Sequence, residues 1–448
     1  MVYYGDNGRE YVLAAQAGKG GVGTVSEIKG DSSIVAKIFH KRDKDRDEKI
    51  EALRFLHWTA EAEEYLVRPQ VVLFEDPKMT KQCGYIMENI APFMPLTEAF
   101  SGRHTLSIRK RAVIAEELCK AVYAIQHNGR DEVGSIVLGD FNFNNIAVKS
   151  HTGKIKIMDC DSLHLKTKKN GKLKILPCTE LYEDFFMPEL LTLQRKHNNA
   201  PFKQLSQNGF TTFTIYTDYY CLAYHIHMLL LGCSPFSEKP ISVVGGKSVP
   251  VVHAGHDLAV TANYCYTNLR RDAELPAYCP SFDVITPELQ KLFKRAFEDG
   301  ASDPTKRPRP EEFRKAIEEY VSGLQYCNCD SAFDHYLYKS YNKNYCEWCR
   351  IDKENHTKKR IDKGDINYMT NKELEHMCDL SFVSNDLKAM AYLELALRHI
   401  GKAKIMIDGN MPIPSVVDKQ GAQKLSKKAY AIAESQKLKD FSKKMMLI

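Results

Sequence analysis

VLGDFNFNNIAV at residues 137–148 and IKIMDCD at residues 155–161 are the most informative stretches of the chain. Each contains a run of apolar, β-forming residues, which predicts a short buried strand. Polar side chains accompany these runs: Asp140 and Asn145 in the first stretch and Asp159 in the second. Burying an unpaired carboxylate is costly, so we expect these side chains to meet a metal ion or a substrate hydroxyl.

A glycine-rich stretch, GKGGVGTV at residues 18–25, lies upstream. Gly18, Gly20 and Gly23 would let backbone N–H groups close over phosphate oxygens, since no Cβ holds the anion away. The pattern alone also fits a tight hairpin turn or a dinucleotide-binding turn. A dinucleotide fold needs an acidic ribose-binding residue after its second parallel strand, whereas here a strand with the sequence Val-Ala-Lys follows.

That strand, Ile34–Phe39, carries one cation, Lys37, among apolar residues. A buried ammonium group needs a partner, and nucleotide phosphates together with a carboxylate would supply one. The helix predicted next offers Glu48 and Glu51, which are three residues apart and therefore on adjacent parts of one face. Glu48 is the favoured partner, Glu51 is the alternative, and a solvent-facing Lys37 on an edge strand is the third interpretation.

The rest of the chain divides into a β-rich beginning and a helical remainder. Runs of β-forming residues lie at Tyr11–Ala15, Thr24–Ile28, Ile34–Phe39, Gln70–Phe74 and Gly84–Glu88, and helical spacing of apolar residues marks Asp43–Leu56, Ile108–Asn128 and Asp218–Leu231. A small β-rich part followed by a larger helical part predicts two lobes with a cleft between them.

In order and spacing, these stretches resemble the protein-kinase family. Asp140 and Asn145 keep the D-x-x-x-x-N spacing of its catalytic loop, and Asp159 stands at the aspartate of D-F-G. Four later segments extend the resemblance over about two-thirds of the chain: MPE at 187–189, TDYYCLA at 217–223, GCSPF at 232–236 and DPTKRP at 303–308. They resemble the A-P-E element, the central helix whose aspartate holds the catalytic loop, the turn after that helix, and the D-P-x-x-R-P motif. The resemblance implies that the arginine of the last motif pairs with Glu189.

The resemblance implies an α+β, bilobal protein-kinase fold with a β-rich N-lobe at residues 1–90 and a helical C-lobe at 91–325. It also implies transfer of the γ-phosphate of ATP to Ser/Thr hydroxyls of a protein substrate, with the chain itself and a protein from the same operon as the candidates. Lys37 would hold the α- and β-phosphates, steadied by Glu48, and Asp140 would orient and deprotonate the hydroxyl. Asn145 and Asp159 would bind Mg²⁺. The implied nucleotide-binding residues are Gly18, Gly20, Gly23, Val25, Ala36, Lys37, the gatekeeper Met87, the hinge residues Glu88 and Ile90, Asn145 and Asp159.

The sequence departs from the kinase pattern at three places, and these departures leave alternatives to a protein kinase open. Leu138-Gly139 replaces His-Arg, which removes the usual docking point for an activation-loop phosphate and predicts activity without such phosphorylation. Asn142 replaces a lysine that neutralises the γ-phosphate, and Asp161 replaces the glycine of D-F-G. The alternatives are therefore an inactive pseudokinase that binds nucleotide as a scaffold, and a small-molecule kinase similar to the aminoglycoside phosphotransferases. The A-P-E and D-P-x-x-R-P elements argue against the second, because they build a platform for protein substrates.

Two cysteine pairs, Cys327-x-Cys329 and Cys346-x-x-Cys349, resemble a zinc ribbon at residues 326–350. Four thiolates suit tetrahedral Zn²⁺, and so short a segment can hardly bury enough apolar surface to fold unaided. His335 is an alternative to one of the cysteines, and four buried or free thiols are the other interpretation. Residues 351–448 are predicted to form a lysine-rich helical extension of unknown role.

The chain has 448 residues and a net charge of +6, which is ordinary for a soluble folded protein. Its first ten residues lack a signal-peptide pattern and no apolar run could span a bilayer, so we expect a cytoplasmic location and no membrane partner. Its thirteen cysteines are then expected as thiols or metal ligands rather than disulfides.

The lysine-rich end has no regularly interleaved aromatic residues, so a solvated helix face is favoured over a nucleic-acid partner. A kinase domain followed directly by a ribbon resembles bacterial eukaryotic-like kinases. These kinases are encoded beside a phosphatase and a von Willebrand A-type protein in tellurite-resistance-like gene clusters, which implies those two proteins as partners.

Overall fold

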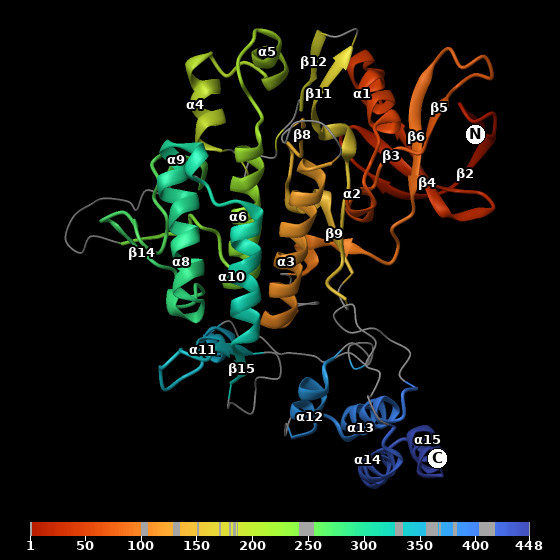
Figure 1. The fold of residues 1–448 in the computed structure, drawn as a ribbon, viewed down its shortest axis with the longest axis vertical. Helices are drawn as coiled ribbons and strands as arrows, with labels where there is room; N and C mark the ends of the chain where they lie inside the picture. The colour runs from red at the N-terminus through yellow and green to blue at the C-terminus, as the bar shows by residue number, and fades with distance from the viewer. Residues whose placement is uncertain are drawn as a thin grey trace.

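Strands gather at the N-terminal end of the molecule and helices follow, as Figure 1 shows. The computed structural model describes residues 2–99, 106–128, 135–149, 152–169, 172–178, 181, 185, 187–241, 255–327, 335–354, 366, 369–379, 383–402 and 417–447. The mixed helix and strand content predicted from the sequence is confirmed. No helix among these residues is long and apolar enough to cross a bilayer.

The N-terminal part is a closed β-barrel with the strand order β1-β2-β3-β4-β6-β5. Its strands are β1 (Val2–Gly5), β2 (Glu10–Lys19), β3 (Gly23–Ile28), β4 (Asp31–Phe39), β5 (Val71–Phe74) and β6 (Gln82–Glu88). Alternate side chains of a strand face opposite sides, so each strand contributes apolar residues to the interior, including Tyr11, Ala36 and Ile86. Helices α1 (Lys44–Phe55) and α2 (Ala60–Tyr65) connect β4 to β5.

Two small sheets lie between the barrel and the helices. The first has the order β10-β9-β7 and the second β12-β11-β8. Their elements, with the short 3₁₀ turns between them, are β7 (Met94–Pro95), η1 (Leu96–Ala99), β8 (Ile136–Val137), η2 (Phe143–Asn145), β9 (Ile146–Val148), β10 (Ile155–Ile157), η3 (Cys160–Ser162), β11 (His164–Lys169) and β12 (Lys172–Leu176). Since β9 and β10 are antiparallel with Ile146 opposite Ile157, the residues just before β9 and just after β10 meet at one end of this pair.

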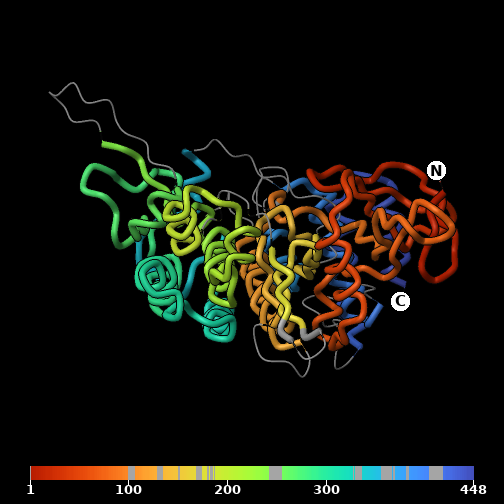
Figure 2. The backbone as a smooth tube through the Cα atoms, turned by 90° about the horizontal axis from the view of Figure 1, so that it is seen from above, coloured from red at the N-terminus to blue at the C-terminus, as the bar shows by residue number. Residues whose placement is uncertain are grey.

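The helical part is built around α3 (Ile108–Gln126) and α6 (Ile215–Leu231), which pack against each other. Almost every residue of α6 is buried, and the helix ends at Gly232, whose φ of 71° suits glycine. The remaining elements are α4 (Pro188–Lys196), α5 (Phe202–Gln207), β13 (Lys239–Pro240), α7 (Gly255–Val260), β14 (Ala273–Glu274), η5 (Phe282–Val284), α8 (Pro287–Lys294), the π-helical turn η6 (Arg295–Asp299), α9 (Gly300–Ser302), η7 (Pro304–Lys306) and α10 (Pro310–Ser322). Figure 2 shows the barrel at one end, α8 to α10 at the other, and β8 to β12 between them.

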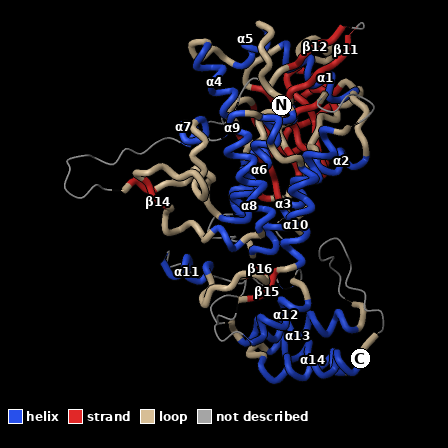
Figure 3. The backbone as a smooth tube through the Cα atoms, turned by 60° about the vertical axis from the view of Figure 1, so that its left-hand side comes forward, coloured by secondary structure: helices blue, strands red, loops and turns tan. Residues whose placement is uncertain are grey.

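The C-terminal elements lie beneath the helical part in Figures 1 and 3. A short hairpin and one helix come first: β15 (Leu324–Tyr326), β16 (Tyr336–Tyr338) and α11 (Glu347–Glu354). Four helices with their own apolar clusters follow: α12 (Asn371–Asp379), α13 (Asn385–His399), α14 (Lys419–Ile432) and α15 (Gln436–Met446).

Candidate active site

The glycine-rich stretch forms the hairpin between β2 and β3. Gly20 N donates to Gly23 O at 2.9 Å, which closes the turn. A Cβ on Gly23 would lie 2.6 Å from the backbone oxygen of Ile38 on β4, so only glycine fits there. Gly18 pairs with Val25 across the hairpin, and Val25 in turn lies opposite Lys37 on β4. The predicted phosphate-binding residues and Lys37 thus lie on adjacent strands.

Lys37 is only 7% exposed and points toward the segment that follows β10. Its Nζ contacts Asp159 Oδ1 and donates to Asp161 Oδ1 at 2.6 Å. Burial alone would lower the pKa of Lys37, but the negative charges of Asp161 and Asp159 outweigh it and raise that pKa above its ordinary value. Lys37 is therefore charged at neutral pH.

The predicted ion pair between Lys37 and Glu48 is wrong. Glu48 Oε2 accepts from Lys174 Nζ of β12 at 2.5 Å, and Glu51 is exposed. The buried residues of α1 are Lys49, Ile50 and Leu53, so the inward face of this helix presents a lysine rather than a carboxylate. Helical spacing placed both glutamates on one face, but it could not show that this face turns toward β12.

Asp159 adopts a left-handed conformation, with φ 59° and ψ 47°, directly after β10. Aspartate tolerates this conformation better than most residues, and it turns the chain sharply before η3. Burial and then the charge of Asp161 raise the pKa of Asp159 to about 6, while Lys37 acts in the opposite direction. A divalent cation at this carboxylate would favour its ionised form.

Asp140 and Asp159 line one cavity, and Asn145 contacts Asp140. The Asn145 side-chain amide donates to Asp140 O at 2.8 Å and to Asp140 Oδ2 at 3.3 Å. Met158 N donates to Asn145 O at 2.8 Å, which ties Asn145 to the segment between β10 and Asp159. The cavity is lined by residues from both parts of the molecule, among them Asp140, Asp159, Asp161, Lys49 and Val22. The Asp159 carboxylate and the remaining amide oxygen of Asn145 are hard oxygen donors, which fit Mg²⁺.

The predicted role of Asp218 in α6 is confirmed. Its carboxylate is fully buried and accepts from Leu138 N at 2.8 Å and from Gly139 N at 3.1 Å, directly before Asp140. The sequence did not indicate a third donor, Gln126 Nε2, at 2.8 Å. Burial raises the pKa of Asp218 to about 7, and the three donors act against that rise.

Gly139 explains why no arginine precedes Asp140. Its φ is +71°, and a Cβ there would lie 2.8 Å from Cys178 Cβ and 2.9 Å from Cys178 Sγ. Any larger side chain would displace the segment around Cys178, so this position is closed to the arginine of the family pattern.

The predicted pairing of Glu189 with Arg307 is also confirmed. Arg307 Nη1 and Nη2 donate to the two carboxylate oxygens of Glu189 at 2.7 Å and 2.6 Å. The guanidinium also donates to Tyr216 O at 2.8 Å and is completely buried. A bidentate pair of this kind fixes the start of α4 against η7 and α6.

The predicted hinge lies at the end of β6, which pairs with the strand carrying Lys37. Met87 lies opposite Val35, and Ala36, which is completely buried, lies opposite Ile86. Glu88 is half-buried and pairs through its side chain with Lys156 Nζ of β10 at 2.8 Å, a contact that the sequence did not indicate. Ile90 follows two residues later, also half-buried.

A second cluster gathers Cys327, His335, Cys346 and Cys349, whose ligand atoms all lie within 4.8 Å of one another. Cys329, the other predicted ligand, lies outside the described residues. His335 Nδ1 is 3.2 Å from Cys349 Sγ, and His335 Nε2 is 3.0 Å from Asp352 Oδ2. A histidine that presents one nitrogen to thiols and the other to a carboxylate is typical of a metal ligand. This donor set fits tetrahedral zinc.

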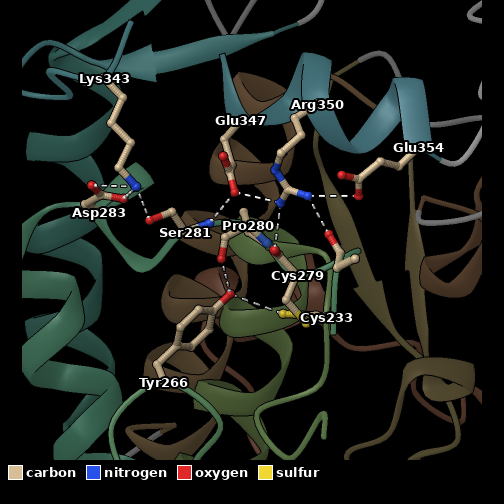
Figure 4. Close-up of polar contacts among 11 residues, drawn as sticks. Cys233, Tyr266, Cys279, Pro280, Ser281, Asp283, Lys343, Glu347, Arg350 and Glu354 are labelled. Carbon is tan, nitrogen blue, oxygen red and sulfur yellow. Dashed lines mark hydrogen bonds and ion pairs between the residues drawn. The ribbon is translucent and has the colours of Figure 1, made fainter. Parts of the chain in front are cut away.

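The cluster helix α11 is fastened to the helical part by the polar contacts in Figure 4. Glu347 accepts from Ser281 N at 2.9 Å, and Arg350 donates to Ala277 O at 2.8 Å and to Cys279 O at 3.2 Å. Lys343 adds a bond to Ser281 Oγ at 2.6 Å. These contacts hold α11 against residues 277–281, so a metal ion bound by the cluster would add a second constraint on this helix.

Two curated bacterial proteins are similar to this chain, and both are named protein kinase YegI. The one from Escherichia coli (strain K12) is 24% identical over 357 residues, which cover 76% of this chain and 49% of the relative. The one from Escherichia coli O157:H7 is 24% identical over 354 residues, which cover 76% and 48%. No protein-family model matches the chain.

The chain is a distant relative of these kinases. It spans about half the length of these curated relatives. The similarity supports a kinase-type function.

Proposed function

We propose that this chain is a protein kinase that uses ATP and Mg²⁺ to phosphorylate serine or threonine hydroxyls of a protein. The observation that carries the proposal is that Asp140 and Asp159, from two separate stretches of the sequence, line one cavity. Lys37 contacts Asp159, and Asn145 donates to Asp140. Structural ion pairs alone rarely gather a buried lysine, carboxylates and an amide beside a glycine-rich hairpin.

The proposed chemistry assigns one task to each side chain. Lys37 would hold phosphate oxygens by its charge, and Asp159 with Asn145 would hold the divalent cation that accompanies the nucleotide. Asp140 would orient the acceptor hydroxyl and take its proton. ATP with its cation supplies the phosphoryl group, and the residues contribute position and electrostatic stabilisation.

The proposed organisation follows from this assignment. Residues 1–90 would be the N-lobe and 91–325 the C-lobe, with the adenine bound to the backbone of Glu88 and Ile90. Residues 326–350 would be a structural zinc ribbon, and 351–448 an extension without an assigned role. The buried pair of Glu189 with Arg307 supports a protein acceptor, because it braces the surface where a protein substrate would dock.

The test is phosphate transfer from γ-radiolabelled ATP with Mg²⁺, to the chain itself and to candidate acceptor proteins. We expect transfer by the unaltered chain, at least about a hundredfold less by Asp140→Asn, and none by Asp159→Ala. Asp272→Asn is a matched control, because Asp272 is an exposed carboxylate that pairs at the surface with Arg270.

ATP binding without transfer, unchanged by Asp140→Asn, would contradict the proposal and favour a pseudokinase scaffold. Transfer to small hydroxyl compounds but to no protein would contradict it in favour of a small-molecule kinase.

A further inference from the structure

The inward face of α1 carries the opposite charge to the one predicted. Lys49 is 4% exposed, and its Nζ donates to two backbone oxygens, Asp161 O at 3.0 Å and Pro177 O at 2.7 Å. Burying an ammonium group is costly unless it is hydrogen-bonded, and these two bonds compensate for the burial of Lys49 Nζ. They hold the segment after β10 and the segment after β12 against α1.

Asp161 supplies the carboxylate that α1 does not present to Lys37. Its Oδ1 accepts from Lys37 Nζ at 2.6 Å and from the Tyr85 hydroxyl at 3.0 Å. Tyr85 is completely buried and lies opposite Lys37 on the neighbouring strand. The carboxylate is thus held by a cation and a hydroxyl, while Lys49 holds its backbone.

Asp159 also contacts Lys37, but its position suits a different task. The side chain of Asp159 is 29% exposed, whereas that of Asp161 is 4% exposed. A cation arriving with the nucleotide can reach Asp159, and it would take up the oxygens that now face Lys37. Asp161 is enclosed and would keep its bond to Lys37.

We infer that Asp161 is the positioning residue that holds Lys37 toward the nucleotide phosphates, with Lys49 fixing the backbone of Asp161. Relative to the sequence prediction, the carboxylate partner of Lys37 comes from η3 instead of α1, and the inward face of α1 presents Lys49. This inference rests on the proposed function for its phosphates, but the pairing itself is a property of the free chain.

The experiment has two arms on the full chain. The first measures kcat and KM for MgATP in the unaltered chain, Asp161→Asn, Lys37→Met and the double variant. The second measures, without nucleotide or metal, how fast an amine-reactive reagent labels Lys37, with the modified peptide quantified by mass spectrometry. Glu48→Gln is the discriminating variant, because it makes the same chemical change at the carboxylate that pairs with Lys174 instead. Circular dichroism and thermal unfolding verify that each variant is folded.

We expect Asp161→Asn to lower kcat/KM at least about tenfold, since a misplaced Lys37 loses its alignment with the phosphates. In the Lys37→Met background the same change should cost less than about twofold, because the two residues act as one unit. Lys37 in Asp161→Asn should be labelled several-fold faster than in the unaltered chain, and Glu48→Gln should change neither measurement.

Two results would overturn the inference: an Asp161→Asn effect that is equally large without Lys37, or labelling of Lys37 that responds to Glu48→Gln and not to Asp161→Asn. If the unaltered chain transfers no phosphate, the proposed function fails while the labelling arm still decides the pairing.

Discussion

At the scale of single residues, Asp218 shows how a buried carboxylate fixes the backbone before Asp140. Both of its oxygens are used as acceptors, Oδ1 by Gly139 N and Oδ2 by Leu138 N and Gln126 Nε2. Asparagine offers one acceptor oxygen in place of two, so one of these donors would face an NH₂ group.

We therefore expect Asp218→Asn to lower the free energy of unfolding by about 1–3 kcal/mol and to reduce phosphate transfer. Urea denaturation measures the first effect. Asp257→Asn is the control, because Asp257 is half-exposed and its ion pairs with Arg195 and His256 lie at the surface. A change of less than about 0.5 kcal/mol is expected there. Equal destabilisation by the two variants would show that Asp218 does not stabilise the backbone at Leu138 and Gly139.

Residues that belong to recognisable sequence motifs could be predicted correctly from the sequence. Asp218 and Arg307 could be assigned because their motifs recur at fixed places, and the structure joins them to Leu138 and Glu189. The partner of Lys37 was missed because helical spacing gives a face but not its direction. From the sequence, Asp161 is only a residue in place of a glycine, because its proximity to Lys37 depends on the left-handed turn at Asp159.

At the scale of elements, regular segments were easier to predict than short irregular ones. The predicted helices Asp43–Leu56 and Ile108–Asn128 correspond to α1 and α3 within two residues at each end, because apolar spacing and caps mark them. Strand β1 and the β11–β12 hairpin were missed. Both also pair with distant segments, β1 with β5 and the hairpin with β8, which no local pattern encodes.

The cluster helix α11 offers a test of metal binding through Trp348, which is buried on this helix beside the cysteines. In a Trp58→Phe variant it is the sole tryptophan of the chain. We expect a strong chelator to shift its fluorescence to longer wavelength, since loss of the metal would undo the fold around it, and added Zn²⁺ to reverse the shift.

Cys346→Ser should bind no stoichiometric zinc, whereas Cys378→Ser should bind as much as the unaltered chain, because Cys378 is a buried thiol of α12 outside the cluster. Asp352→Asn should weaken zinc binding by about 10- to 100-fold through loss of its contact with His335. Zinc content that is the same in all four proteins would exclude this cluster as the metal site.

At the scale of the whole molecule, three buried histidines make stability depend on pH. Burial lowers the pKa of His164 to about 4 and the pKa values of His225 and His227 to about 3. The unfolded chain takes up protons at these histidines near pH 6.5, whereas the folded chain does not. The contribution of the three neutral histidines to the free energy of unfolding is therefore fully present above that pH. It is lost as the pH falls toward 4, by about 1.4 kcal/mol per pH unit for each histidine.

His227→Phe isolates one of these contributions, because the ring lies among Tyr264, Phe293 and Phe297 and phenylalanine is an aromatic ring that does not titrate. The variant also loses the hydrogen bond to Cys233 O, which lowers its stability but does not change the slope with pH. We expect the free energy of unfolding of this variant to fall less steeply between pH 6 and pH 4 than that of the unaltered chain, by about 1.4 kcal/mol per pH unit. Asp218, whose pKa is raised, contributes with the opposite sign in both proteins and therefore cancels in the comparison. Identical slopes would contradict a neutral, buried His227.

The arrangement of the whole molecule brings the barrel and the helical part together around the cavity lined by Asp140 and Asp159, where we propose that the nucleotide binds. An experimental structure with Mg²⁺ and a non-hydrolysable ATP analogue tests this most directly. The triphosphate should lie beneath the β2–β3 hairpin with Lys37 on its oxygens, the cation on Asn145 and Asp159, and Asp140 facing the terminal phosphate. A nucleotide bound elsewhere, or these four side chains directed to separate places, would contradict the account.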